Sequence, residues 1–226
     1  MTLEKVTENG RRRYDDACGA ALGMDYVGER WALLLMRELL LGPRRFGELR
    51  SGLPGISANV LTQRLTGLEV AGIVRRERLP PPASAQVYAL TPWGMESEPV
   101  VLALGRWALR SPAHDTSLPF SRVSLMLSLR MLMVQERAAG FTATMAFHLG
   151  EERYVARLTA GDLRVWRGEV DAPDAILAGE TAAFKPVLYG GMPLAVAEAT
   201  GRIAVAGNRA VVERFTGLFR LPDKVE

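Results

Sequence analysis

The stretch from Pro43 to Leu90 constrains the fold most, because it combines two short helical patterns with two strand-like runs. A helix is predicted over Arg45–Gly52, and Pro54 and Gly55 then force a turn. Ser57 stands where a helix N-cap belongs, and the residues that follow at i, i+4 and i+7 spacing are Leu61, Leu65 and Leu68. This spacing buries one stripe of a helix, so the sequence predicts a second helix that stops at Gly72.

The opposite face of this second helix is polar and uncharged. At about 100° per residue, Asn59, Thr62, Gln63 and Thr66 gather there. A helix that enters the major groove of DNA uses such side chains to reach base edges. A solvated face that happens to lack charge is the other interpretation, and this helix alone does not separate the two.

The segment after the helix favours DNA binding. Two strand-like runs, residues 73–78 and 86–90, are joined by a Pro-rich tip over Leu79–Ala85, which is typical of a wing. Seven arginines and three glutamates lie between Arg44 and Arg78, and the arginines sit at the ends of the motif, where phosphate contacts would flank a base-reading helix. The predicted DNA contacts are Arg44, Arg45, Ser57, Asn59, Thr62, Gln63, Arg64, Thr66, Arg75, Arg76 and Arg78.

Apolar helices are predicted on both sides of this motif. They cover Asp15–Val27, Glu29–Leu41 and Pro92–Leu109, the last with Thr91 as N-cap. The last helix carries a stripe of Val100, Leu104, Trp107 and Ala108, which suits either a partner helix or the chain's own core.

Four motifs in order resemble the HxlR-type winged-helix transcriptional regulators, relatives of the MarR group. They are CGAALGMDYVGERW from Cys18, LLLMRELLLGPRRFGELRSGLPGIS, VLTQRLTGLEVAGIVRR and VYALTPWG, and the likeness covers roughly residues 14–110. The resemblance implies a homodimer that places Ser57–Ala71 in the major groove and the wing along the backbone or minor groove. It also implies a two-fold operator with half-sites roughly 34–36 Å apart, and a dimer built by the N-terminal helix and the helix after the wing.

Cys18 occupies a position where members of this family often carry a cysteine, which in some of them is a redox sensor. Here Gly19 replaces the usual following proline, and Asp15 and Asp16 would oppose thiolate formation. A redox sensor and a small buried thiol are the two alternatives for Cys18.

Length and charge agree with a two-domain regulator. The chain has 226 residues, 48% of them hydrophobic, and its net charge of +3 comes entirely from residues 1–111. The single cysteine, the polar N-terminus and the absence of a membrane-length apolar run lead us to expect a cytoplasmic protein without membrane attachment. Residues 1–13 are expected to form a flexible arm that either touches DNA or is a frayed terminus.

The second half of the chain follows a Pro-containing linker over residues 111–119. A long helix over Phe120–Ala139 is predicted, then an antiparallel meander of residues 141–149, 153–159 and 163–167. A strand at 175–179, helices at 182–188 and 193–199, a strand at 202–206 and a helix at 208–219 complete the order. With AEATGRIAVAGNRAVVERFTGLF, this order over roughly residues 120–220 resembles the sterol-carrier-protein-like fold. The predicted class is α+β: a winged helix-turn-helix domain (14–110) and a sterol-carrier-like α+β domain (120–226).

An apolar small molecule is a possible effector for the second domain. The large side chains that would line its cavity are Phe141, Met145, Phe147, Trp166, Phe184, Tyr189 and Met192, although the same residues could simply fill the core.

We expect neither an enzyme nor a bound metal or cofactor. His114 and His148 have no partner at metal-ligand spacing, Asp171 and Asp174 are better explained as turn residues, and the chain has no P-loop, GxGxxG or GxSxG motif. A DNA-binding regulator is favoured over an apolar-ligand carrier whose winged helix contacts proteins, and over an enzyme.

Overall fold

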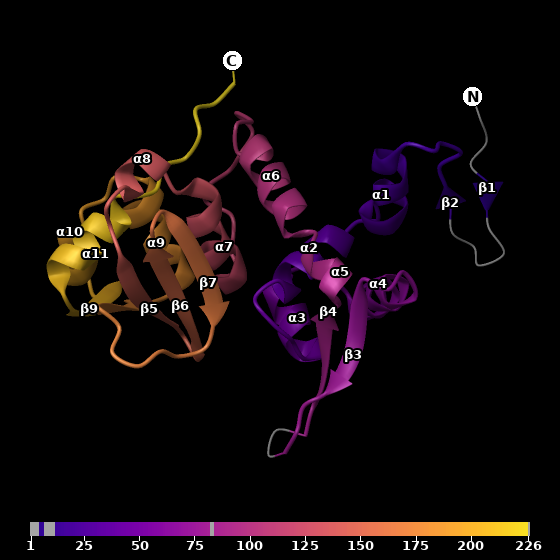
Figure 1. Cartoon of the computed structure of the whole chain (residues 1–226), viewed down its shortest axis with the longest axis horizontal. Coiled ribbons are helices and arrows are strands. Elements are labelled where there is room, and N and C mark those ends of the chain that lie inside the picture. Colours follow the sequence, from indigo (N-terminus) through magenta and orange to yellow (C-terminus); the bar gives the residue numbers. More distant parts are fainter. Residues whose placement is uncertain (1–4, 7–11, 82–83, 226) are drawn as a thin grey trace. The chain divides into compact units, whose positions relative to one another are not determined.

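The computed structural model describes residues 5–6, 12–81 and 84–225. The chain divides into two compact units, residues 1–98 and 99–226, and each is described by itself (Figure 1). Most of the predicted N-terminal arm lies outside the described residues. In its described part, β1 (Lys5–Val6) pairs antiparallel with β2 (Arg12–Arg13).

The first unit is a winged helix-turn-helix, as predicted from the sequence. Its helices are α1 (Gly19–Val27), α2 (Ala32–Leu39), α3 (Phe46–Gly52), α4 (Ala58–Val70) and α5 (Pro92–Met95). The wing is the antiparallel pair of β3 (Val74–Arg78) and β4 (Gln86–Leu90). Leu35 of α2, Leu49 of α3 and Leu61 of α4 are fully buried, so these three helices share one apolar core.

The predicted single helix over Pro92–Leu109 is wrong. It is two helices, α5 and α6 (Glu98–Ala108), separated at Glu96 and Ser97. The reason is Pro99, which has no N–H to donate and is accommodated in the first turn of a helix rather than in its interior.

The predicted helix over Phe120–Ala139 is also interrupted. It is split into α7 (Arg122–Leu132) and α8 (Gln135–Ala138). Between them Met133 is extended and forms a bridge with Phe219, while the Val134 N–H donates to the carbonyl oxygen of Leu218 at 2.9 Å. The backbone here exchanges helical hydrogen bonds for bonds to the C-terminal segment, a long-range pairing that helical periodicity does not reveal.

A five-stranded mixed sheet with the order β7-β6-β5-β8-β9 organises the second unit. The strands β5 (Ala143–Leu149), β6 (Glu152–Thr159) and β7 (Asp162–Arg167) form the antiparallel meander predicted from the sequence. β8 (Ala175–Gly179) runs parallel to β5, and the edge strand β9 (Ile203–Gly207) pairs antiparallel with β8. The remaining helices are α9 (Thr181–Tyr189), α10 (Leu194–Ala199) and α11 (Arg209–Thr216).

The core of this unit forms where α9 and α11 meet β5. The ring centroid of Phe147 on β5 lies 5.8 Å from that of Phe184 on α9 and 6.1 Å from that of Phe215 on α11. All three residues are at most 1% exposed. In the described residues, no helix is long and apolar enough to span a bilayer.

Candidate nucleic-acid interface

Helix α4 has one face in the core and the other in solvent. The Ser57 hydroxyl caps it by accepting a hydrogen bond from the Val60 N–H at 3.2 Å. Leu61, Leu65 and Leu68 are at most 2% exposed and hold the inner face. The predicted contact residues Ser57, Asn59, Thr62, Gln63 and Thr66 are all exposed.

The two amide side chains are free hydrogen-bonding groups of this face, as is the hydroxyl of Thr66 among the described residues. The Thr62 hydroxyl donates to the Ala58 carbonyl oxygen at 3.0 Å, so part of its capacity is used within the helix. The side chains of Asn59 and Gln63 make no hydrogen bond with any residue that the structure describes. An amide that carries both a donor and an acceptor and is left to solvent can pair with a base edge.

Arg64, predicted to contact DNA, is instead tied to the turn between α1 and α2. Its Nε donates to the Arg30 carbonyl oxygen at 3.0 Å, and its Nη2 lies 2.7 Å from the Glu29 carboxylate. These contacts fix the orientation of α4 on the rest of the winged helix. Arg64 therefore helps to position the polar face, and its contact with DNA stays a prediction.

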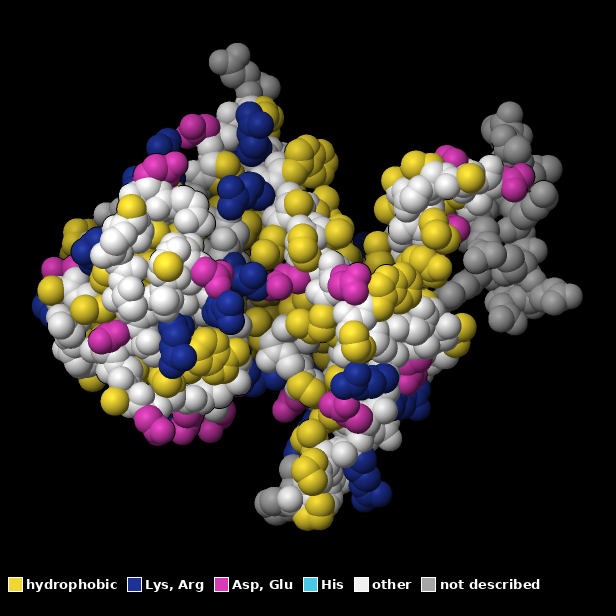
Figure 2. Space-filling view, viewed as in Figure 1, with side chains coloured by type: hydrophobic (Ala, Val, Ile, Leu, Met, Phe, Trp, Pro, Cys, Tyr) yellow, Lys and Arg dark blue, Asp and Glu magenta, His cyan; other side chains and the backbone are white. Residues whose placement is uncertain are grey.

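The arginines of β3 differ in how firmly they are held. Arg75 lies 3.1 Å from the Glu77 carboxylate, and Arg76 lies 2.8 Å from the Glu69 carboxylate. The guanidinium of Arg76 is also 5.4 Å from the ring centroid of Tyr88, and its hydrogen bond to Glu69 raises the pKa of Arg76 further. Arg78 is exposed and makes no ion pair within the described ranges. Figure 2 shows the basic side chains along the wing.

Arg44 requires a correction, because the residue is only 6% exposed. Its backbone pairs with Tyr88 of β4, with N–H to O distances of 2.9 and 2.8 Å, and so adds a third strand segment to the wing. A side chain that is buried to this degree does not reach a phosphate. Arg45 is exposed, and so is Arg50 on α3, which was counted among the seven arginines but not predicted as a contact.

Two helices expose apolar side chains. α1 and α6 have no buried residue, and hydrophobic side chains lie open over both helices in Figure 2. On α6 the exposed fractions are 58% for Val100, 44% for Leu104 and 72% for Trp107. The other side of α6 faces α7, where the Arg106 guanidinium donates to the Met131 carbonyl oxygen. The apolar stripe of α6 is thus not part of the chain's own core.

Cys18 is exposed, which excludes the interpretation as a buried thiol. It is the N-cap residue of α1, and the backbone N–H groups of Ala20 and then Ala21 lower the pKa of its thiol. The Asp16 carboxylate accepts a hydrogen bond from the Cys18 backbone N–H at 2.9 Å. The redox role remains a prediction.

The side chains predicted to line an apolar cavity mostly fill the core instead. Phe141, Met145, Phe147 and Phe184 are at most 7% exposed. The Trp166 ring packs against the guanidinium of Arg157 at 5.3 Å. The Tyr189 hydroxyl lies 2.5 Å from that of Ser128, and burial raises the pKa of Tyr189, while Met192 is half-buried. This arrangement favours core filling over a ligand cavity.

The two histidines and the Asp171/Asp174 pair were considered as metal ligands from the sequence. Within the described residues, no group of three or more His, Cys, Asp or Glu side chains could hold an ion. Asp174 accepts a hydrogen bond from the Thr144 N–H at 2.7 Å, the structural role expected of a loop carboxylate.

Comparison with known proteins identifies both domains. The HxlR-like helix-turn-helix family model matches residues 26–115. The HTH-type transcriptional regulator YvaP of Bacillus subtilis is 35% identical over 85 residues, which cover 38% of this chain and 79% of YvaP. The chain belongs to the HxlR-like helix-turn-helix family. It is a transcriptional regulator of HxlR type, and the SCP-2 sterol transfer family model matches its residues 128–220.

Further transcriptional regulators are similar to part of this chain. The uncharacterized HTH-type transcriptional regulator sll1512 of Synechocystis is 41% identical over 81 residues, which cover 36% of this chain and 60% of that relative. Among solved structures, the reduced form of the transcriptional regulator YodB from B. subtilis is 31% identical to this chain. The match covers 44% of this chain and all of the YodB chain, with a TM-score of 0.39.

Proposed function

We propose that this HxlR-type regulator binds a two-fold-symmetric operator as a homodimer and reads bases with the exposed face of α4. The observation that carries the proposal is the pair of unpaired amides, Asn59 and Gln63, on a helix whose opposite face is locked into the core. Asn and Gln side chains can pair bidentately with adenine in the major groove. Ser57, Thr62 and Thr66 extend the same face.

The arginines provide affinity and register in this proposal. Arg45, Arg75, Arg76 and Arg78 are exposed, and each can contact a phosphate. Because Arg75 and Arg76 already have carboxylate partners, their contacts require exchange of an ion pair, whereas Arg78 is available without that cost. We add Arg50 to the proposed phosphate contacts because it is exposed on α3.

The apolar faces of α1 and α6 support the homodimer. Helices of 9 and 11 residues are marginal in water by themselves, and neither buries a residue in the monomer. A second copy that covers Val100, Leu104 and Trp107 would supply the missing packing. Two α4 helices would then meet half-sites about one helical turn apart.

The sterol-carrier-like domain is the proposed effector domain of this regulator. The SCP-2 family description supports an apolar ligand, whereas the predicted cavity residues are largely occupied in core packing. An apolar effector would therefore have to open the domain or bind elsewhere on it.

Selection of genomic DNA fragments by the purified full-length protein tests the proposal. The wild-type protein should retain a small set of fragments that share a two-fold repeat, and the Asn59→Ala/Gln63→Ala double variant should lose this selectivity. Gln135→Ala, an exposed glutamine of α8, is the matched control and should select as the wild type does. Retention of random fragments by all three proteins would contradict operator reading.

A further inference from the structure

The second unit contains an open groove that the sequence did not suggest. It has a volume of about 690 Å³ and lies at the end of the sheet where the parallel strands β5 and β8 finish. His148 near the end of β5, Arg153 on β6 and Gly179 at the end of β8 contribute to it, and Arg202 reaches it just before β9. Cavities of roughly 300–1,000 Å³ are the size that accommodates small-molecule ligands.

Small residues leave this space open. Six of the lining residues are glycine or alanine, including Gly179 and Ala182. A Cβ at Gly179 would lie 2.5 Å from the Arg202 carbonyl oxygen, so a larger residue there would push against the segment that carries Arg202. The floor of the groove is therefore made of glycine backbone and alanine methyl groups, on which the body of a small ligand can lie.

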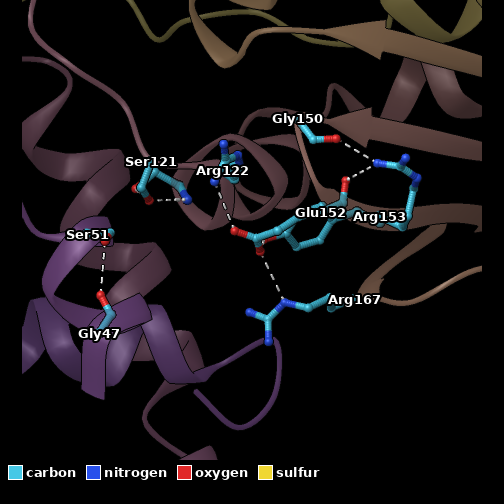
Figure 3. A network of polar contacts seen from close by, with 10 residues as sticks. Gly47, Ser51, Ser121, Arg122, Gly150, Glu152, Arg153 and Arg167 are labelled. Atoms are coloured by element: carbon cyan, nitrogen blue, oxygen red, sulfur yellow. Dashed lines mark hydrogen bonds and ion pairs between the residues drawn. The ribbon is translucent and has the colours of Figure 1, made fainter. Parts of the chain in front are cut away.

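The charged side chains of the groove are two arginines and one glutamate. Arg153 is held by two hydrogen bonds from its Nη1, to the carbonyl oxygens of Gly150 at 2.7 Å and Glu152 at 3.2 Å (Figure 3). Arg202 is exposed, and its side chain makes no contact of this kind with the residues that the structure describes. The glutamate is Glu180, the N-cap residue of α9.

His148 adds a neutral polar group. Burial, and then the charge of Arg153, lowers the pKa of His148, while the charge of Glu169 opposes this shift; the neutral imidazole donates one hydrogen bond and accepts one. Among the side chains that line the groove, two arginines and one glutamate leave an excess of one positive charge. The N-terminus of α9, the positive end of its helix dipole, also lies at the groove and favours an anion there.

We propose that this groove binds a small metabolite that carries a single carboxylate, with the anion between Arg153 and Arg202 and the body on the glycine and alanine floor. One net positive charge complements a monoanion better than a dianion, and Arg can hold a carboxylate in a bidentate manner. This site differs in place and in chemistry from the apolar cavity expected between the sheet and its helices.

The groove is also connected to the linker that follows α6. One turn beyond Ala182, Lys185 of α9 donates from its Nζ to the carbonyl oxygens of Thr116 at 2.7 Å and Leu118 at 3.0 Å. A ligand that shifts the start of α9 would thereby act on the segment that follows α6, a consequence that rests on the proposed regulatory function.

The chain's two histidines give a direct readout of the site, since only His148 lines the groove. The experiment is a titration of the full-length protein with benzoate, followed by the imidazole proton resonances in NMR spectra. Benzoate should shift the His148 resonance with a Kd of about 1–10 mM, the range for a ligand of this size, and leave His114 unchanged. Benzamide, which has the same shape without the charge, and inorganic phosphate are the comparison probes.

Variants assign the effect to the groove. Arg202→Gln should weaken benzoate binding at least roughly tenfold, since the side chain is exposed and the fold does not depend on it. Arg164→Gln, an exposed arginine of β7 outside the groove, should bind as the wild type does.

Several results would overturn the proposal: no His148 shift with benzoate, an equal shift with benzamide, a stronger response to phosphate, or an equal loss in both variants. The titration uses no DNA, so it stands or fails separately from operator binding. Benzoate that binds the groove but leaves operator affinity unchanged would refute the connection through α9 alone.

Discussion

The exposed face of α4 and the groove of the sterol-carrier-like domain present polar groups in opposite ways. On α4 the side chains proposed to read bases project from a rigid helix, and the fold does not need them: Asn59 and Gln63 could change while Leu61 and Leu65 keep the helix in place. In the groove, the recognition surface is space that glycine and alanine leave empty, with Arg153 and Arg202 at its edge.

This difference indicates which substitutions should affect binding and which should affect stability. Substitutions of Asn59 and Gln63 on α4 should change binding and not folding. Large residues of the second unit, such as Phe147, should change folding and not binding, because they pack on one another and not on a ligand.

The largest expected effect is on stability. Phe147→Ala should lower the free energy of unfolding by about 3–5 kcal/mol, because it removes a fully buried ring between two others. Denaturant unfolding measures this, with Val196→Ala, which is 47% exposed, as a control expected within about 0.5 kcal/mol of the wild type. A loss below about 1 kcal/mol would mean that the ring lines a cavity and not a packed core.

The dimer should be the next most sensitive feature. Trp107→Glu places a charge in the proposed apolar interface and should weaken self-association by roughly 2–4 kcal/mol, the range of interface hot spots. Sedimentation equilibrium measures the change. Leu118→Glu alters a side chain of similar exposure outside α6 and should leave the dimer intact, and an equal effect of both variants would argue against α6 as the interface.

Base reading by α4 predicts a smaller and selective effect. Gln63→Ala should weaken binding to the selected operator by about 1–3 kcal/mol and leave binding to random DNA unchanged. Fluorescence anisotropy with both DNAs provides the comparison, with Gln135→Ala as the matched substitution. The same loss on both DNAs would indicate that Gln63 makes a nonspecific contact with DNA and does not read a base.

The wing should contribute affinity without selectivity. Arg78→Ala should weaken all DNA binding by about 1 kcal/mol and reduce the salt slope by about one unit. Arg76→Ala should do less, since Arg76 is already paired with Glu69. If Arg76→Ala has the larger effect, the ion pair seen in the free protein opens on DNA.

The Cys18 thiol should show the most local effect. Because backbone N–H groups stabilise the thiolate, the pKa is lowered and the rate of alkylation by iodoacetamide should rise at a lower pH than for a free cysteine. The pH dependence of that rate measures the shift. A midpoint at or above that of free cysteine would remove the basis for a sensing role.

The sequence predicted those parts of the molecule in which the local pattern of residues alone decides the structure. The leucine spacing of α4, Ser57 as its cap and the strands of the wing followed from periodicity and turn chemistry. The polar face of α4 could be predicted because its side chains are exposed and do not pack in the core.

The missed features depend on contacts distant in sequence or on empty space. The burial of Arg44 follows from its bridge to Tyr88, and the break at Met133 from pairing with Phe219. The contacts of Arg64 with Glu29 and Arg30 were missed because they have no local signal in the sequence. The groove is lined largely by glycine and alanine, and these residues give no sign of a binding site in a sequence.

Hydroxyl-radical footprinting of the selected operator tests base reading by a dimer most directly. We predict two protected segments, centred roughly 34–36 Å apart on one face of the duplex, with both lost together in the Asn59→Ala/Gln63→Ala variant. A single protected segment, or an unchanged footprint in that variant, would contradict the proposed function.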